Sequence, residues 1–116
     1  MQIDVRFPCD DGFEMPGVLT LPEGATAERR PALLVIYELF GLNAEIRRVA
    51  RDFAAEGYIS LIPDLFSRAI KPICVARCLR ALARHEGQPI DDLEAARRWL
   101  AARPEVDSDR LGALAL

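Results

Sequence analysis

Polar and apolar residues alternate at the start of the chain. Residues 2–7 place Ile3, Val5 and Phe7 at every second position, which is the period of a strand with one buried face. An Asp-Gly pair, a common hairpin turn, follows, and residues 15–21 have the composition of a returning strand. The pattern predicts an antiparallel β-hairpin.

A later strand lacks this alternation. Residues 32–37 are an unbroken apolar run, which is typical of a parallel strand covered by helices on both faces, and residues 58–62 are the next predicted strand. Between them, Asn43 is a favourable helix N-cap, apolar residues recur at helical spacing, and Gly57 is a favourable residue just past a helix end. The pattern predicts a β-α-β unit with a right-handed crossover.

Two further helices are predicted in the second half of the chain. The first covers residues 73–86 and is ended by residues 87–89. The second begins with Asp91 as N-cap and Glu94 in the capping-box position, and it ends near Arg103. The apolar stripe expected on the first of these helices consists of Val75, Cys78, Leu79, Leu82 and Ala83.

A last apolar strand is predicted at residues 110–116, after a turn at residues 104–109. No polar or turn-forming residue follows this strand, and an exposed strand edge invites pairing with another chain. We therefore expect a sequence that is cut rather than finished. The predicted fold class is α/β, a β-hairpin followed by parallel β-α-β units in an incomplete sheet.

The composition is that of one soluble globular domain, with 116 residues, 51% hydrophobic and 28% charged. The net charge of -3 comes from interspersed charges without a basic run, which argues against a nucleic-acid partner. No apolar stretch approaches the roughly 20 residues of a membrane span, and the N-terminus lacks a signal-peptide pattern. We expect a cytoplasmic protein without a membrane partner.

Carboxylates follow the two parallel strands of the predicted β-α-β unit. Glu38 lies at the strand-to-helix turn, and ligands of α/β proteins bind just beyond the carboxyl ends of parallel strands. Asp64 follows Pro63 after the next strand, where we expect hydrogen bonds to nearby backbone N–H groups. No Gly-rich phosphate-binding motif follows any strand, which argues against a nucleotide-binding domain. Glu38 is therefore the first candidate for chemistry.

These features resemble the dienelactone hydrolases (carboxymethylenebutenolidases) of the α/β-hydrolase fold. The resemblance covers most of the chain, and its most specific part is the run from Glu38 to Asn43. The segments that carry it are Glu38-Leu39-Phe40-Gly41-Leu42-Asn43, Ile46-Arg47, Gly57-Tyr58, Pro63-Asp64-Leu65-Phe66, Asp92-Leu93-Glu94-Ala95-Ala96 and Arg110-Leu111-Gly112. It implies that residues 1–116 are a single partial α/β-hydrolase domain that ends just before the nucleophile elbow.

The resemblance also implies roles for two neighbouring residues. Glu38 matches a glutamate that helps to generate the thiolate of a cysteine nucleophile, and Leu39 matches the residue whose backbone N–H belongs to the oxyanion hole. The alternative for Glu38 is that it only anchors the turn through backbone hydrogen bonds. The nucleophile, the triad acid and the triad histidine would lie beyond residue 116. No metal or organic cofactor is implied.

Family enzymes hold the carboxylate of their substrate with arginines. Arg77 and Arg80 are the candidates in this chain, because a planar guanidinium matches two carboxylate oxygens. The segment that carries them departs from the family pattern, so dienelactone itself is not established as the substrate. The alternative is that both arginines belong to a solvated helix face.

The remaining nucleophile and base candidates are weaker. His85 precedes the position of the elbow, whereas the fold places its histidine last. Cys9, Cys74 and Cys78 are an odd number of cysteines without CxxC spacing, and we expect free thiols in packing positions.

Two functions follow from the sequence. The first is hydrolysis of a small-molecule ester or lactone by acyl transfer, with the 116-residue chain alone expected to be inactive. The alternative is a non-catalytic half-domain that acts as an interaction module and self-associates through its last strand.

Overall fold

A computed structural model describes residues 1–24, 28–36, 43–68 and 71–115. The elements in chain order are β1 (Gln2–Pro8), β2 (Glu14–Thr20), β3 (Arg30–Ile36), α1 (Ala44–Ala55), β4 (Ile59–Pro63), α2 (Lys71–Arg84), α3 (Gln88–Ala101) and β5 (Val106–Ala115).

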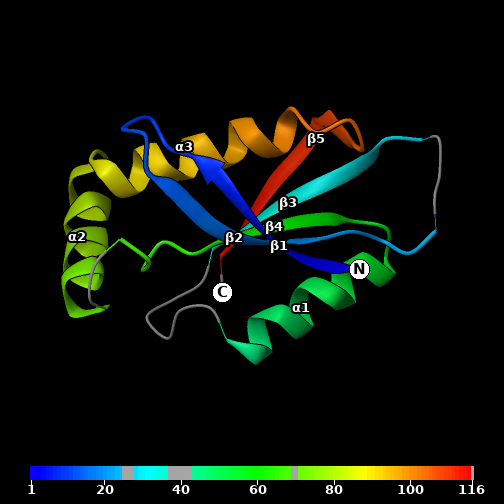
Figure 1. Ribbon diagram of the computed structural model, residues 1–116, viewed down its shortest axis with the longest axis horizontal. Helices are drawn as coiled ribbons and strands as arrows, with labels where there is room; N and C mark the ends of the chain where they lie inside the picture. Colours follow the sequence, from blue (N-terminus) through cyan, green and yellow to red (C-terminus); the bar gives the residue numbers. More distant parts are fainter. Residues whose placement is uncertain (25–27, 37–42, 69–70, 116) are drawn as a thin grey trace.

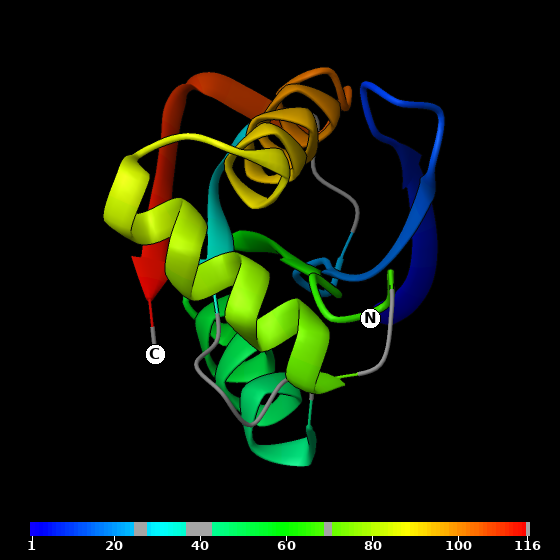
Figure 2. The same ribbon diagram turned by 90° about the vertical axis from the view of Figure 1, so that its left-hand side faces the viewer.

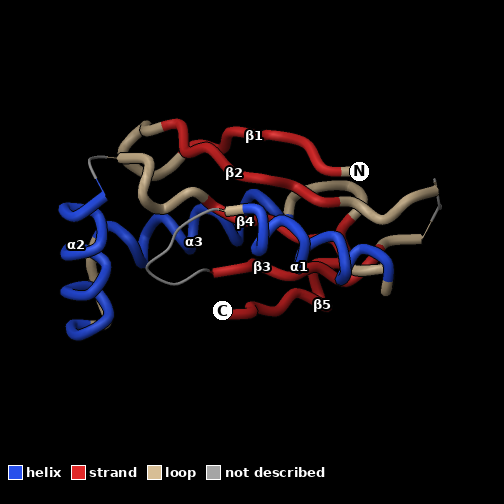
Figure 3. The backbone as a smooth tube through the Cα atoms, turned by 90° about the horizontal axis from the view of Figure 1, so that it is seen from below, coloured by secondary structure: helices blue, strands red, loops and turns tan. Residues whose placement is uncertain are grey.

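The five strands form one mixed sheet in the order β1-β2-β4-β3-β5 (Figure 3). β1 and β2 are an antiparallel hairpin, and β2 also pairs antiparallel with β4. β3 lies between β4 and β5 and is parallel to both. The predicted α/β class, with a hairpin followed by parallel β-α-β units, is confirmed.

Helices cover both faces of this sheet. α1 lies on one face against β4 and β2, and α3 lies on the other face against β1, β3, β4 and β5 (Figures 1 and 2). α2 lies across one end of the sheet and packs mainly against α3 (Figure 2). The unbroken apolar run of β3 is thus covered on both sides, as its pattern predicts.

The first hairpin strand, β1, buries its apolar face most completely near the turn. Phe7 pairs with Met15, both are fully buried, and the Phe7 ring lies 6.1 Å from the ring of Trp99 on α3. Ile3, on the same predicted face, is 36% exposed. The alternation therefore gave the correct strand, while the depth of burial follows from where α3 crosses it.

The end signals of α1 act as predicted. The Asn43 side chain accepts a hydrogen bond from the backbone N–H of Ile46 at 3.0 Å, so Asn43 is the N-cap. Gly57 follows the C-cap Glu56 with φ +92°, a left-handed conformation that glycine adopts without strain.

The start of α3 differs from the prediction. The helix begins at Gln88 with Gly87 in the N-cap position, four residues before the predicted N-cap. Pro89 fits inside the first turn because the N–H it lacks would have no helical partner there. The predicted N-cap, Asp91, lies in the first turn, and Glu94 pairs with Arg97 at 2.6 Å. The predicted capping box is wrong.

The buried face of α2 also differs from the predicted stripe. Cys74 and Ala81 are buried and Cys78 is half-buried, because α2 meets α3 along these positions. Leu79, at 56%, and Ala83 are exposed instead, and the side chains of Val75 and Leu82 lie outside the described part of the chain. α2 therefore presents a partly apolar surface to solvent.

β5 begins earlier than predicted, inside the expected turn. Arg30 pairs with Val106 and Ala32 with Leu111, so the register shifts between the two pairs. Within the intervening segment, the Asp107 carboxylate accepts a hydrogen bond from the N–H of Asp109 at 3.1 Å. The predicted turn is therefore present as a local hydrogen bond at Asp107, but it lies within β5, as an irregularity of that strand.

Candidate functional site

The carboxyl ends of the parallel strands meet at one edge of the sheet. β3 ends at Ile36 and β4 at Pro63, and Asn43 starts α1 on the same side. The backbone N–H of Asp64 donates to the carbonyl of Pro16 at 2.8 Å, which fastens the end of β4 to the hairpin. The Asp64 carbonyl accepts hydrogen bonds from the N–H and hydroxyl of Ser67, at 3.2 and 2.7 Å. This edge is therefore built on a fixed backbone.

Glu38 and Leu39 belong to residues 37–42, which lie outside the described residues. Ile36 and Asn43, the described residues on either side, lie at the end of the sheet where the parallel strands finish. The assisting role of Glu38 and the oxyanion role of the Leu39 N–H stay predictions.

Arg77 and Arg80 lie on α2 and are exposed. Both line an open hollow of about 660 Å³ at the corner between α2 and α3, together with Arg84. Two carboxylate residues, Glu86 and Asp91, line the same hollow. The structure thus brings the two predicted arginines together on one surface, and their clamp role stays a prediction.

A buried ion cluster that the sequence did not reveal lies near this corner. Nε and Nη2 of Arg68 donate to the two carboxylate oxygens of Asp92, each at 2.8 Å. Nη1 and Nη2 also donate to the carboxylate of Asp11 at 2.9 and 3.0 Å. The guanidinium lies 4.4 Å from the centre of the Phe13 ring, and Gln88 donates to Asp11 at 3.0 Å. Arg68, which lies in the segment after β4, therefore connects the hairpin turn to α3.

The two carboxylates of this cluster sit in different environments. The Asp92 side chain is 5% exposed, whereas that of Asp11 is 48% exposed. Hydrogen bonding to Arg68 lowers the pKa of Asp11. Hydrogen bonding to Asp92, and after it to Asp11, raises the pKa of Arg68. The sequence held one signal: Asp92 lies in helical register with the buried Ala96 and Leu100, and a carboxylate there requires a partner.

The environment of the cysteine nearest the cluster disfavours its thiolate form. Cys9 is 6% exposed, and burial raises its pKa to about 11, with a further rise from the charge of Asp92 and a hydrogen bond to it. Burial likewise raises the pKa of Cys78. Since the thiolate is the nucleophile, these thiols are protonated at neutral pH, which agrees with packing roles. His85 follows the end of α2 with φ +55° and is exposed.

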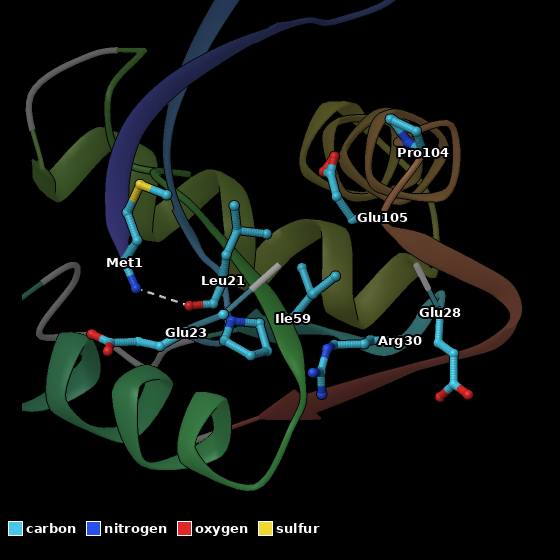
Figure 4. Close-up of a pocket in the computed structure, with 10 residues that line it drawn as sticks. Met1, Leu21, Glu23, Glu28, Arg30, Ile59, Pro104 and Glu105 are labelled. Carbon is cyan, nitrogen blue, oxygen red and sulfur yellow. Dashed lines mark hydrogen bonds between the residues drawn. The ribbon is translucent and has the colours of Figure 1, made fainter. Parts of the chain in front are cut away.

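A second open hollow, of about 630 Å³, lies at the opposite end of the sheet, where the parallel strands β3 and β4 begin (Figure 4). Arg30 and Ile59, which begin β3 and β4, line it together with Met1 and Leu21. The N-terminal ammonium donates to the carbonyl of Leu21 at 2.9 Å there. This hollow is therefore remote from the carboxyl ends of the strands.

Two absences apply to the described residues. None of their His, Cys, Asp and Glu side chains form a group of three that could hold a metal ion. No described helix has the length and apolar content needed to cross a membrane.

Comparisons with known proteins agree on one family. The model of the dienelactone hydrolase family matches residues 15–115. A "Putative carboxymethylenebutenolidase" from Azospirillum brasilense is 27% identical over 101 residues, which are 87% of this chain and 43% of that protein. A "Probable 2-oxo-3-(5-oxofuran-2-ylidene)propanoate lactonase" from Bradyrhizobium sp is 32% identical over 89 residues, which are 74% of this chain and 36% of that protein.

A crystal structure from Klebsiella pneumoniae, named as a "Putative Dienelactone Hydrolase", is 26% identical with a TM-score of 0.79. The alignment covers 100% of this chain and 49% of that one. The chain therefore spans less than half the length of the relatives that it matches here.

Proposed function

The chain belongs to the dienelactone hydrolase family, and from that premise we propose that the whole protein hydrolyses a small-molecule ester or lactone by acyl transfer. The observation that carries the proposal is the match over residues 15–115, which includes the strand-to-helix turn after β3. The sheet order and the parallel pairing of β3 with both neighbours support it, since they gather strand ends at one edge.

In the proposed reaction, a Cys or Ser nucleophile attacks the carbonyl carbon of the substrate, the ester or lactone C–O bond breaks and its oxygen leaves as the alcohol, and water then hydrolyses the acyl-enzyme to release the acid. This sequence contains no Gly-x-Cys/Ser-x-Gly motif to provide that nucleophile. The Glu38 carboxylate would accept the proton of the nucleophile, and the Leu39 N–H would donate to the developing oxyanion, a contact worth about 3 to 4 kcal/mol. Asn43 supports this arrangement because its cap fixes the start of α1.

The proposed substrate clamp consists of Arg77 and Arg80, whose exposed guanidinium groups could bind a carboxylate of the substrate. The alternative is that both side chains belong to a solvated helix face. Substituting each with Gln should raise the KM of the full reading-frame product for a carboxylate-bearing lactone and leave KM for p-nitrophenyl acetate unchanged. Equal effects on both substrates would contradict a clamp.

The experiment that tests hydrolysis compares two proteins with p-nitrophenyl acetate as substrate. The product of the full reading frame should turn over the ester, and Glu38→Gln should lower its kcat. The 116-residue chain should show no turnover above buffer. Activity of that chain that falls with Glu38→Gln would contradict its inactivity, and no turnover by the full product on esters or lactones would contradict the hydrolase.

A second candidate, favoured by the edge of β5, is a self-associating half-domain. In the described part of the chain, β5 pairs only with β3, and residues 111–115 at its end are uncharged. The other sheet edge, β1, carries Asp4 and Arg6, and charges on an edge strand oppose pairing between chains. Sedimentation velocity at several concentrations tests this candidate, and a monomer throughout would rule it out. Ala113→Lys, which charges the β5 edge, is the matched control.

A further inference from the structure

Arg30 lies between two hollows at the end of the sheet where β3 and β4 begin. It lines the hollow of about 630 Å³ in Figure 4, and it also lines an adjoining open hollow of about 450 Å³ that borders α1. Leu21 and Pro22 line both hollows as well. We call the smaller one the α1 hollow. Its volume is in the range of sites that bind small molecules.

The guanidinium of Arg30 has no acidic partner. The residue is half-buried, and within the described ranges its side chain takes part in no ion pair and no hydrogen bond. Gly57 leaves room for it, since a Cβ at that position would lie 3.1 Å from Nη1 of Arg30. The N–H donors of Arg30 are therefore open to whatever occupies the hollow.

A second arginine, Arg51 of α1, lines the α1 hollow. Its Nη1 donates to Oε1 of Gln2 at 2.9 Å. Gln2 is itself held in place, because its Nε2 donates to the hydroxyl of Thr20 at 3.1 Å and to the carbonyl of Arg47 at 2.8 Å. Arg47 and Arg48 on the same helix pair with carboxylates, whereas Arg51 has no ion pair in the described part of the chain. Gln2 thus orients Arg51 without neutralising its charge.

Acidic side chains leave this positive charge only partly compensated. Among the described residues that line the α1 hollow, Glu23 has the one carboxylate, and it is exposed. The carboxylates of Glu23 and Glu28 point away from the guanidinium of Arg30 (Figure 4). Glu105, which lines the larger hollow, pairs with Arg103 at 3.2 Å. Two arginine charges therefore face the α1 hollow against one carboxylate.

Most of the other residues that line the α1 hollow are apolar. Leu21 and Pro22 contribute from the segment after β2, and Ala54 and Ala55 contribute from α1. The two alanines follow Arg51 by three and four residues, so they lie on the same side of the helix as that arginine. A ligand in the hollow would therefore meet positive charge at one end and apolar surface along its body.

This combination of groups matches a small organic carboxylate. A planar guanidinium donates two parallel N–H bonds to a carboxylate, and such charge-assisted bonds are stronger than bonds to a neutral acceptor. Inorganic phosphate would satisfy the arginines but would leave the apolar lining uncovered. A neutral apolar molecule would cover that lining and leave the arginines unpaired.

We propose that the α1 hollow binds a small monocarboxylate with an apolar body. The carboxylate pairs with Arg30 and Arg51, and the body lies against the apolar lining from Leu21 to Pro22 and from α1. This site lies at the end of the sheet opposite the carboxyl ends of the parallel strands. Binding at it requires neither a nucleophile nor a catalytic base, so the proposal is independent of the proposed hydrolysis.

An NMR titration of the isotope-labelled 116-residue chain with benzoate tests the proposal. Backbone amide shifts should saturate with a Kd on the order of 1 mM, the range expected for so small a ligand. They should concentrate on residues 20–23, 30 and 51–57. Benzamide, a neutral analogue of the same shape, should bind at least about fivefold more weakly. Added salt should weaken the binding of benzoate, since exposed ion pairs are screened.

Four variants separate the contributions to binding. Arg30→Gln should weaken benzoate binding about tenfold, and Arg30→Lys should weaken it less, because an ammonium keeps the charge but loses the planar fork. Arg51→Gln should weaken it about threefold. Glu23→Gln should strengthen it, because the substitution removes a charge that repels the ligand. The matched control is Arg29→Gln, which removes a neighbouring exposed arginine outside the hollow and should leave the Kd unchanged.

Far-UV circular dichroism shows whether each variant is folded. If Arg30→Gln unfolds, Arg51→Gln decides, because that side chain is exposed on a helix. The proposal is overturned by absent or unsaturable shifts, by equal binding of benzamide, by an unchanged Kd in Arg51→Gln, or by an equal loss in Arg29→Gln. Inorganic phosphate that binds the same residues more tightly than benzoate would also overturn it, because the apolar lining would then contribute nothing.

Discussion

Removing the charge of Arg68 should destabilise the fold far more than any surface substitution. In Arg68→Met, the Asp92 carboxylate loses both of its hydrogen bonds from Arg68 while its side chain remains about as buried as before, 5% exposed in the native fold. Breaking a buried ion pair from one side costs about 3 to 5 kcal/mol, because the remaining charge is unsolvated. Asp11, which is 48% exposed, regains water, so it adds little to that cost.

We expect a loss near the lower limit of this range, about 3 kcal/mol. For a domain of this size that loss corresponds to roughly 12 °C in Tm. Urea denaturation followed by the fluorescence of Trp99 measures it, since this residue packs against the hairpin through Phe7.

Two further variants test the reasoning behind this value. The double variant Arg68→Met, Asp92→Leu leaves no buried charge and should recover a large part of the lost stability. Arg97→Met, which removes an exposed pair with Glu94, should cost less than about 0.5 kcal/mol. A loss below about 1 kcal/mol for the single variant, or a double variant less stable than the single one, would refute the argument.

Three other predictions concern the caps and the titrating groups. Asn43→Ala should cost about 1 kcal/mol in urea denaturation because the N–H of Ile46 loses its acceptor, whereas Asn43→Ser should retain most of the stability; equal losses would contradict the cap. Cys9 should resist a thiol reagent at pH 8 until the protein is unfolded, as measured by mass spectrometry of the labelled peptide, and labelling in the native state as fast as in urea would contradict its burial. Folding raises the pKa of Cys9 from 9.0 to about 11, so the contribution of this thiol to stability should be complete below pH 9 and lost as pH rises toward 11. Arg68 lowers the pKa of Asp11, so the contribution of this carboxylate should be lost as pH falls below the ordinary pKa range of an aspartate. Urea titrations across pH measure both, and Cys9→Ala should remove the alkaline loss but not the acid one.

The parts of the fold that were predictable rest on local chemistry. Alternation predicted the hairpin, an unbroken apolar run predicted β3, and Asn43 and Gly57 predicted the ends of α1, because each signal acts on its own neighbours. The predicted start of α3 was wrong for a related reason. Asp91 is a favourable cap by residue type, but Pro89 can occupy a first turn, and the sequence does not say which of the two begins the helix.

The ion cluster could not be found by reading along the chain. Asp11, Arg68 and Asp92 are far apart in sequence, and only the packing of α3 over the hairpin brings them together. The candidate active-site residues were found in another way, through the resemblance around Glu38 and its position after a buried strand. Spatial partners of such residues are set by the whole sheet and have no local sequence signal.

The contact between Phe7 and Trp99 has a consequence for the order of folding during synthesis. The hairpin leaves the ribosome well before α3, yet its most deeply buried ring packs against that helix. Until α3 emerges, the hairpin must expose Phe7 and Met15 to solvent or to a chaperone. The earliest strands of this protein are therefore among the last to acquire their native environment.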